Sequence, residues 1–276
     1  MVESLKELNQ KVQKPNYKKV GNWMVRHIER DLALYITWAL LHTKITANQV
    51  TFFSIIVGLL SALAFCFPIP GGFLTGVLLL QFWYLLDHVD GQIARYRETA
   101  SLTGVYFDYI THYVVHSFLF IGLGIGAYLS HGMTGMLLLG IIAALFMAFL
   151  SMFYDAKWKA FYHWFQFLKI ERAEFKWPEI KTADDAKEKS SFLKSAFVFL
   201  CKLSEIHVIM NILTVLAVIG LFRFDFIFGG FDLTIPEFIT LFYASLLPFI
   251  FIIRTAHAVM KQTLDKEFNE LVNRNA

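Results

Sequence analysis

The chain has 276 residues, of which 57% are hydrophobic and 17% aromatic, and its formal net charge is +3. Soluble domains are about 45–50% apolar, so this composition excludes an ordinary soluble protein and predicts an all-α integral membrane protein. The length suits one bundle of about six transmembrane helices of roughly 20 residues each. Two cysteines give no disulfide framework. No nucleic-acid partner is expected.

The first 45 residues contain no apolar run long enough to cross a membrane. Residues 1–22 are polar and basic, and we expect them to form an N-terminal arm without a cleavable signal peptide. Over residues 23–45, apolar side chains recur at helical spacing while charged side chains hold another face. This pattern predicts an interfacial amphipathic helix that lies on the membrane.

Six apolar segments follow, and we interpret residues 46–260 as one six-span catalytic membrane domain. Their expected limits are about 48–67, 72–86, 104–129, 133–154, 196–222 and 238–260. The second helix is expected to continue to about Arg95. The polar connection 155–195 is expected to be cytoplasmic with one or two short surface helices, and residues 261–276 to form a cytoplasmic tail.

The positive charges are distributed very unevenly between the two sides of this layout. Of the 25 Lys and Arg residues, all except Arg223 fall on the side that also carries both termini. Basic loops stay in the cytoplasm. Both termini are therefore predicted to be cytoplasmic, in the cytoplasmic membrane or an equivalent biosynthetic membrane.

The most informative segment begins where the second apolar run ends. It reads Asp87-His-Val-Asp90-Gly91-Gln-Ile-Ala94-Arg95, and it is followed by Gly104, Asp108 and His112. Carboxylates at a membrane edge are costly and usually face a protein interior or a watery cavity. Residues three or four apart share one helix face, so each helix presents a pair of these groups. If the two helices pack side by side, all four groups converge on one pocket.

The residue types in this segment point to metal-assisted phosphate chemistry. Carboxylates close together repel strongly in a low-dielectric site, and divalent cations relieve that repulsion. Oxygen ligands favour Mg²⁺, Mn²⁺ or Ca²⁺, and a metal pair can hold a pyrophosphate. Gly91, Ala94 and Gly104 let a bulky group approach the backbone, and Arg95 suits phosphate. We therefore predict a site for a diphosphate linked to a planar group such as a nucleotide.

The segment resembles the CDP-alcohol phosphotransferase (CDP-alcohol phosphatidyltransferase) family, whose members carry D-x2-D-G-x2-A-R-x8-G-x3-D-x3-D. Every position of that motif except the last matches here at the family spacing. Upstream, Thr46-Ala-Asn48-Gln-Val-Thr51 is similar to the Pro-Asn-x-x-Thr entry common in the family. The six-span layout and the interfacial helix are similar as well. The active site would then lie at the cytoplasmic face.

The resemblance implies that an acceptor hydroxyl attacks the β-phosphate of a CDP-linked donor, CMP leaves, and a phosphodiester forms, in the biosynthesis of phospholipids or related phosphodiesters. At least one substrate would be a lipid, and the protein would be a homodimer. Mg²⁺ or Mn²⁺, as two ions, would be held by Asp87, Asp90 and Asp108. The residues expected against CDP or its phosphates are Asn48, Thr51, Asp90, Gly91, Ala94, Arg95 and Gly104.

One position departs from the family pattern. His112 stands where the family has its fourth Asp, which is expected to be the base near the acceptor hydroxyl and a possible ligand of the second metal. Histidine can act as a general base and can coordinate a metal, so His112 together with Asp108 is the predicted catalytic pair. The alternative is that His112 has lost this chemistry and the protein is a poor or repurposed enzyme.

Two other functions stay open. An intramembrane prenyltransferase also uses Asp-rich magnesium sites, but it usually needs two such motifs and more spans. A transporter or non-catalytic cation-binding protein would carry acidic residues at mid-span on several helices, and the remaining spans are nearly free of them. The acceptor and the substrate that carries CDP also stay open. If the acceptor bears a phosphate, Lys157 and Arg254 are candidates to bind it.

Overall fold

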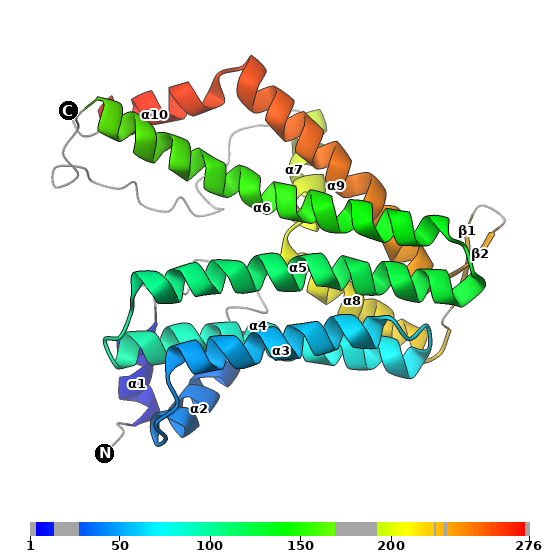
Figure 1. The fold of residues 1–276 in the computed structure, drawn as a ribbon, viewed down its shortest axis with the longest axis horizontal. Helices are drawn as coiled ribbons and strands as arrows, with labels where there is room; N and C mark the ends of the chain where they lie inside the picture. Colours follow the sequence, from blue (N-terminus) through cyan, green and yellow to red (C-terminus); the bar gives the residue numbers. More distant parts are fainter. Residues whose placement is uncertain (1–3, 14–27, 169–191, 224, 229–230, 274–276) are drawn as a thin grey trace.

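A computed structural model describes residues 4–13, 28–168, 192–223, 225–228 and 231–273, and these residues form an almost entirely helical protein (Figure 1). A two-stranded antiparallel hairpin interrupts the helices, with Asp225 opposite Thr234. In chain order the elements are α1 (Leu5–Val12), α2 (Arg30–Leu41), α3 (Ala47–Phe65), α4 (Pro70–Tyr96), α5 (Leu102–His131), α6 (Gly135–Phe167), α7 (Phe192–Leu203), α8 (Ile206–Gly220), β1 (Asp225–Phe228), β2 (Phe231–Thr234), α9 (Ile235–Met260) and α10 (Thr263–Asn273).

Five helices are long and apolar enough to cross a membrane, namely α3, α4, α5, α6 and α9. The pair α7 and α8 passes the same test together, but the two helices are bent by 72° at the break between them. The described residues therefore contain five candidate spans, or six if the bent pair is one span. This agrees with the predicted all-helical integral membrane protein.

The predicted continuous helix over residues 196–222 is instead the bent pair α7 and α8. The backbone of Glu205 is extended, with φ −76° and ψ 130°, and α8 begins directly after it. The Ser204 hydroxyl donates to the Cys201 carbonyl oxygen at 2.7 Å, and the Glu205 carboxylate lies 3.0 Å from His207 Nε2. These polar side chains bond locally where the helical hydrogen bonds end, which lowers the cost of a break.

Residues at the helix starts position the two motif helices, α4 and α5, and the neighbouring helix α3. The side chain of Thr46 accepts from the backbone N–H of Gln49, and the Gln49 side chain caps Thr46 in return, which starts α3. Pro70 occupies the first turn of α4, which then continues without a break through the motif to Tyr96. Ser101 caps α5 by accepting from Gly104 N–H at 3.0 Å. The motif therefore lies on two helices joined by the short loop 97–101.

Helix α5 packs closely against α3 and α6 because glycines remove the side chains between them. A Cβ at Gly122 would lie 2.2 Å from the carbonyl oxygen of Ala62 in α3. A Cβ at Gly124 would lie 2.7 Å from Gly140 Cα in α6. Helix α3 also packs against α4, so α4 and α5 share α3 as a common neighbour. This arrangement leaves the space between α4 and α5 to their side chains.

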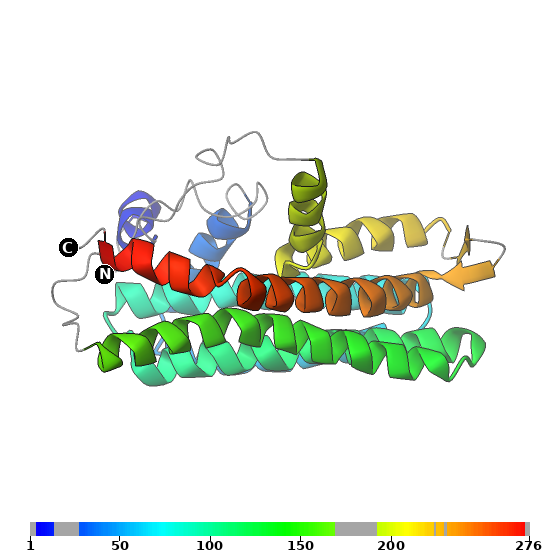
Figure 2. The same ribbon diagram turned by 90° about the horizontal axis from the view of Figure 1, so that it is seen from above.

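The ends of the chain gather at one end of the bundle. Helices α1 and α10 lie at the same end as the α4–α5 loop, and the β hairpin lies at the opposite end, as both views show (Figures 1 and 2). Helix α6 continues to Phe167, beyond its predicted end at 154, and its Phe161 packs against Phe268 of α10. Residues 169–191 of the predicted connection lie outside the described residues.

The predicted interfacial helix over 23–45 is described only in part. Residues 14–27 lie outside the described residues, and α2 begins at Arg30. Helix α2 buries Leu34 and Leu41 and packs against α4, whereas Leu32 and Tyr35 on its other face are exposed. Its position at a membrane surface stays a prediction.

Candidate active site

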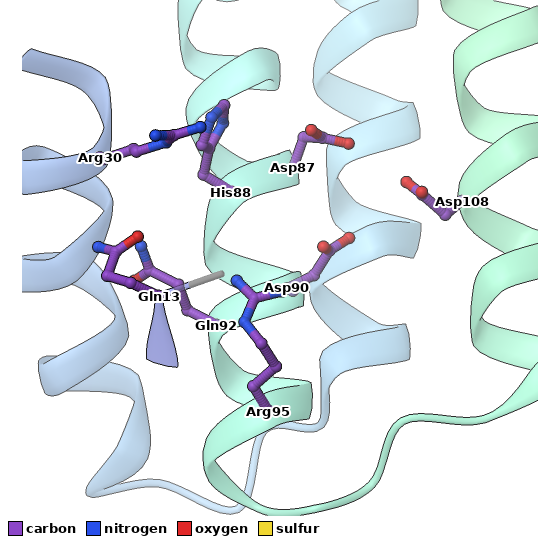
Figure 3. A pocket seen from close by; sticks show the side chains of 9 residues that line it. Gln13, Arg30, Asp87, His88, Asp90, Gln92, Arg95 and Asp108 are labelled. Atoms are coloured by element: carbon purple, nitrogen blue, oxygen red, sulfur yellow. The ribbon is translucent and has the colours of Figure 1, made fainter. Parts of the chain in front are cut away.

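The carboxylates of the motif point toward one another across the space between α4 and α5. Figure 3 shows the side chains of Asp87 and Asp90 from α4 turned toward that of Asp108 from α5. His112 lies one turn beyond Asp108 on α5 and completes the group. The structure therefore brings together the four side chains that the i,i+3 and i,i+4 spacings placed on facing helices.

His112 links the two helices through its ring nitrogen Nε2. This atom lies 2.9 Å from Asp87 Oδ1 and 3.4 Å from Asp108 Oδ1. The imidazole also makes an edge contact with the ring of Trp83, with ring centroids 5.5 Å apart, so packing from α4 fixes its orientation. His112 thus lies in contact with both acidic side chains, at the position where the family pattern has an Asp.

This group could hold a divalent cation. Ligand atoms of Asp87, Asp108 and His112 all lie within 4.8 Å of one another. Two carboxylates and one imidazole form a donor set that suits Mg²⁺ through oxygen, and Mn²⁺ through oxygen and nitrogen. The residues present therefore fit the metal that the sequence predicts.

Asp90 differs from the other carboxylates in its surroundings. Only 8% of its surface is exposed, and its Oδ2 accepts a 2.6 Å hydrogen bond from the Thr51 hydroxyl of α3. It lies outside the group of three ligand atoms that Asp87, Asp108 and His112 present together. The Thr51 contact ties α3 to the motif, because it fixes the Asp90 carboxylate.

A pocket of about 270 Å³ lies between α3, α4 and α5, beside the carboxylates. Gly104 faces Asn48 across it, because a Cβ at residue 104 would lie 3.3 Å from Asn48 Oδ1. A side chain at that position would narrow the pocket. Every residue that the family resemblance places against CDP or its phosphates lines this pocket: Asn48, Thr51, Asp90, Gly91, Ala94, Arg95 and Gly104.

A second pocket, of about 150 Å³, adjoins the same carboxylates and is bordered by α1, α2 and α4 (Figure 3). Besides motif residues, it is lined by four residues to which the sequence assigned no role, namely Gln13, Arg30, His88 and Gln92. Gln13 and Arg30 come from segments far from the motif in the chain. No local spacing pattern could place them here, since their position depends on how α1 and α2 dock on α4.

Specific contacts hold α1 and α2 against α4. The Arg95 side chain donates from Nε to the carbonyl oxygen of Val12, and the Lys11 ammonium lies 5.9 Å from the centre of the Tyr96 ring. The Thr37 hydroxyl of α2 donates to Gln92 Oε1 at 2.8 Å in a buried position. Arg95 therefore ties α4 to the end of α1, and it also lines both pockets.

The chain is similar to known proteins over the segment that contains the motif and the pocket between α3, α4 and α5. Residues 44–177 match the sequence model of the CDP-alcohol phosphatidyltransferase family. A protein of Archaeoglobus fulgidus named "Bifunctional IPC transferase and DIPP synthase" is 37% identical over 122 residues, which are 44% of this chain and 24% of that protein. A protein of the same name from Thermococcus kodakarensis is 34% identical over 119 residues, 42% of this chain and 26% of that protein.

The alignments thus span about a quarter of the length of these curated relatives. The matched residues include α3, both motif helices, the four clustered side chains and the whole pocket between α3, α4 and α5. The sequence motif, the geometry and the comparison agree: residues 44–177 of this chain form a domain of the CDP-alcohol phosphatidyltransferase family.

Proposed function

We propose that this protein is a membrane transferase of substituted phosphate groups. It moves such a group from a CDP-linked donor to an acceptor hydroxyl and releases CMP, and at least one of its substrates is a lipid. The observation that carries this proposal is the single pocket that joins Asn48, Thr51 and Gly104 to the carboxylates of the motif. The names of the two relatives, each a transferase and synthase, support the same reaction class.

The pocket between α3, α4 and α5 would take the CDP part of the donor. Small residues at 91, 94 and 104 leave the helix backbones accessible, so a nucleotide can lie flat against them. Thr51 holds the Asp90 carboxylate at one edge, which orients it toward the diphosphate. Asn48 offers an amide to the same space.

The carboxylates would hold Mg²⁺ or Mn²⁺, as two ions, through Asp87, Asp90 and Asp108. Bound divalent cations supply charge neutralisation for the diphosphate and for the leaving phosphate oxygen. The side chains of α4 and α5 fix where that charge is placed, since they come from two helices that both pack on α3.

His112 would accept the proton of the acceptor hydroxyl at Nε2, the atom that faces the carboxylates. The acceptor oxygen then forms a bond to the donor's β-phosphorus, and the bond from that phosphorus to the CMP oxygen breaks. Asp108, 3.4 Å from the same nitrogen, stabilises the imidazolium that results. Coordination of a metal by Nε2 is the second role open to this residue.

The other functions considered for the sequence gain no support. Within the described residues, a single group of three or more acidic, His or Cys side chains could hold a metal, whereas a prenyltransferase usually needs two Asp-rich motifs. The homodimer, the cytoplasmic position of both termini and the division at residues 22, 45 and 260 stay proposals.

The test is a screen for CMP release. Purified full-length protein in phospholipid vesicles would be given CDP-diacylglycerol or soluble CDP-alcohols with a panel of alcohols, each with Mg²⁺, Mn²⁺ or EDTA. We expect CMP from one donor class and only with metal. Absence of CMP across all donors, together with CDP binding that is unchanged by Asp90→Asn, would refute the proposal.

A further inference from the structure

The carboxylates of the motif are shared by two pockets that differ in their other walls. Asp90, Gly91, Arg95 and Asp108 line both of them. The pocket between α3, α4 and α5 carries the residues proposed for CDP, whereas the pocket bordered by α1, α2 and α4 carries none of the α3 residues. A transfer between two substrates needs two spaces that meet at the reacting atoms. The second pocket has the position that an acceptor requires.

The wall of this second pocket is rich in hydrogen-bond donors. The amide Nε2 of Gln13 is buried and has no hydrogen-bond partner within the part of the chain that the structure describes. A buried donor without a partner costs free energy, which a bound oxygen would remove. Arg30, at the start of α2, adds a guanidinium to the same wall, and Figure 3 shows it extending toward His88 and Asp87.

The charge of this wall favours an anion. The guanidinium groups of Arg30 and Arg95 both line the pocket, and Arg95 faces Asp90 whereas Arg30 lies on the side away from it (Figure 3). Guanidinium groups bind phosphate oxygens with paired, charge-assisted hydrogen bonds. Across the pocket from Arg30 and Gln13 lie Asp87, Asp90 and Asp108, which the proposed function assigns to cations (Figure 3). A phosphate held by Arg30 would therefore place an attached alcohol toward the carboxylates.

The basic residues that the sequence suggested for an acceptor phosphate lie outside this pocket. Lys157 Nζ lies 2.5 Å from Glu267 Oε1 of α10. The Arg254 guanidinium bonds to the Tyr154 hydroxyl and lies 4.8 Å from the centre of the Tyr154 ring. Neither residue lines the pocket beside the carboxylates.

We infer that the pocket bordered by α1, α2 and α4 is a binding site for the phosphate monoester group of a small alcohol acceptor, contacted by Arg30 and Gln13. This inference rests on the proposed function, because it takes the other pocket for the CDP part of the donor. Both residues precede residue 44, where the family match begins, so this side of the pocket comes from the N-terminal segment and the other side from the matched domain. That segment would select the acceptor, while the matched domain carries out the transfer.

The test measures anion binding separately from nucleotide binding. Full-length protein with Mg²⁺ would be titrated calorimetrically with inorganic phosphate, sn-glycerol 3-phosphate, glycerol and CDP. The variants are Arg30→Gln, Arg30→Lys and Gln13→Ala, with Lys159→Gln as the control because Lys159 is an exposed cation outside the pocket. Arg30→Lys keeps the charge and loses the planar fork of donors.

We expect inorganic phosphate and glycerol 3-phosphate to bind the parent protein, and glycerol not to bind. Arg30→Gln should weaken phosphate about 10- to 100-fold, and Gln13→Ala about 3- to 10-fold, with Arg30→Lys in between. Lys159→Gln should leave phosphate affinity unchanged. All variants should bind CDP as the parent does.

Three results would overturn the inference, and a fourth would overturn the proposed function instead. If inorganic phosphate does not bind the parent, or if it binds Arg30→Gln with the same affinity, the proposed phosphate site does not exist. A loss of CDP affinity in Arg30→Gln as large as the loss of phosphate affinity assigns the wall to the donor's diphosphate, not to the acceptor. Failure of the parent to bind CDP and to release CMP refutes the proposed function, whatever phosphate does.

Discussion

At the scale of single residues, the position that most distinguishes this chain from the family motif is His112. Its Nε2 atom lies 2.9 Å from Asp87 Oδ1 and thereby joins α4 to α5. An Asp at this position would add a further negative charge to a group that already repels itself. The imidazole avoids that repulsion and still offers a site that can accept a proton or bind a metal.

Replacing His112 tests whether this residue takes part in the reaction. We expect His112→Ala to lower the rate of CMP release about 100- to 10,000-fold, because the positioned proton acceptor is lost. His112→Asp restores the family pattern and should retain most of the activity. Initial rates at saturating donor measure both effects. An alanine variant that turns over like the parent would exclude His112 as the base.

A second residue, Glu29, should make stability depend on pH. Burial raises the pKa of this carboxyl from its ordinary 4.5 to about 7, although His207 and Arg30 oppose the shift. Between these two values the unfolded chain loses the proton while the folded protein keeps it, so stability falls as pH rises through that window.

Glu29→Gln should therefore flatten the dependence of the thermal unfolding midpoint on pH between about 4.5 and 7. The measurement is a series of melts of the parent and the variant in the same detergent across that range. Parallel curves for the two proteins would show that Glu29 does not retain its proton in the folded state.

The site residues that the sequence revealed are those whose position follows from helical spacing. Asp87 and Asp90, like Asp108 and His112, share a face on one helix, so one packing step brings them together. Gln13 and Arg30 were missed because no spacing rule connects them to residue 87. Their approach depends on tertiary contacts such as the hydrogen bond from Thr37 to Gln92.

At the scale of elements, the glycines of α5 set how closely the bundle packs. A Cβ at Gly122 would come within 2.2 Å of the Ala62 carbonyl oxygen, which is backbone and cannot rotate away. We expect Gly122→Ala to destabilise the protein by about 1–3 kcal/mol through this overpacking. Gly71→Ala is the matched control, because a Cβ there meets nothing within 4 Å.

Thermal unfolding of both variants in detergent tests this. The unfolding midpoint should fall for Gly122→Ala and stay near the parent's value for Gly71→Ala. Equal midpoints for the two variants would contradict the close approach of α3 and α5.

The sequence predicted helix ends well where capping residues mark them and poorly where they are absent. Thr46, Pro70 and Ser101 mark the starts of α3, α4 and α5, and the predicted limits fall within a few residues of the observed ones. The bend at Glu205 was missed because apolar residues lie on both sides of it. The extension of α6 to Phe167 was missed because it depends on packing against α10.

At the scale of the whole molecule, the distribution of Lys and Arg predicts the orientation in the membrane. The variants Thr99→Cys and Asp232→Cys each introduce one cysteine. Residue 99 lies in the loop between α4 and α5 and residue 232 in the β hairpin, at opposite ends of the bundle (Figure 1). In sealed inside-out vesicles, with Cys66 and Cys201 replaced by Ser, a membrane-impermeant maleimide should label position 99 and not position 232. Labelling of both, or of position 232 alone, would contradict the proposed topology.

The central claim is that the carboxylates between α4 and α5 support a metal-dependent transfer from a CDP-linked donor. The most direct test compares CMP release by the parent, by Asp108→Asn and by Asp265→Asn in the presence of Mn²⁺. Asp265 is an exposed acid on α10 and serves as the control. We expect the parent and Asp265→Asn to release CMP at similar rates, and Asp108→Asn to be slower by about 100-fold or more. Equal rates for Asp108→Asn and Asp265→Asn would contradict it.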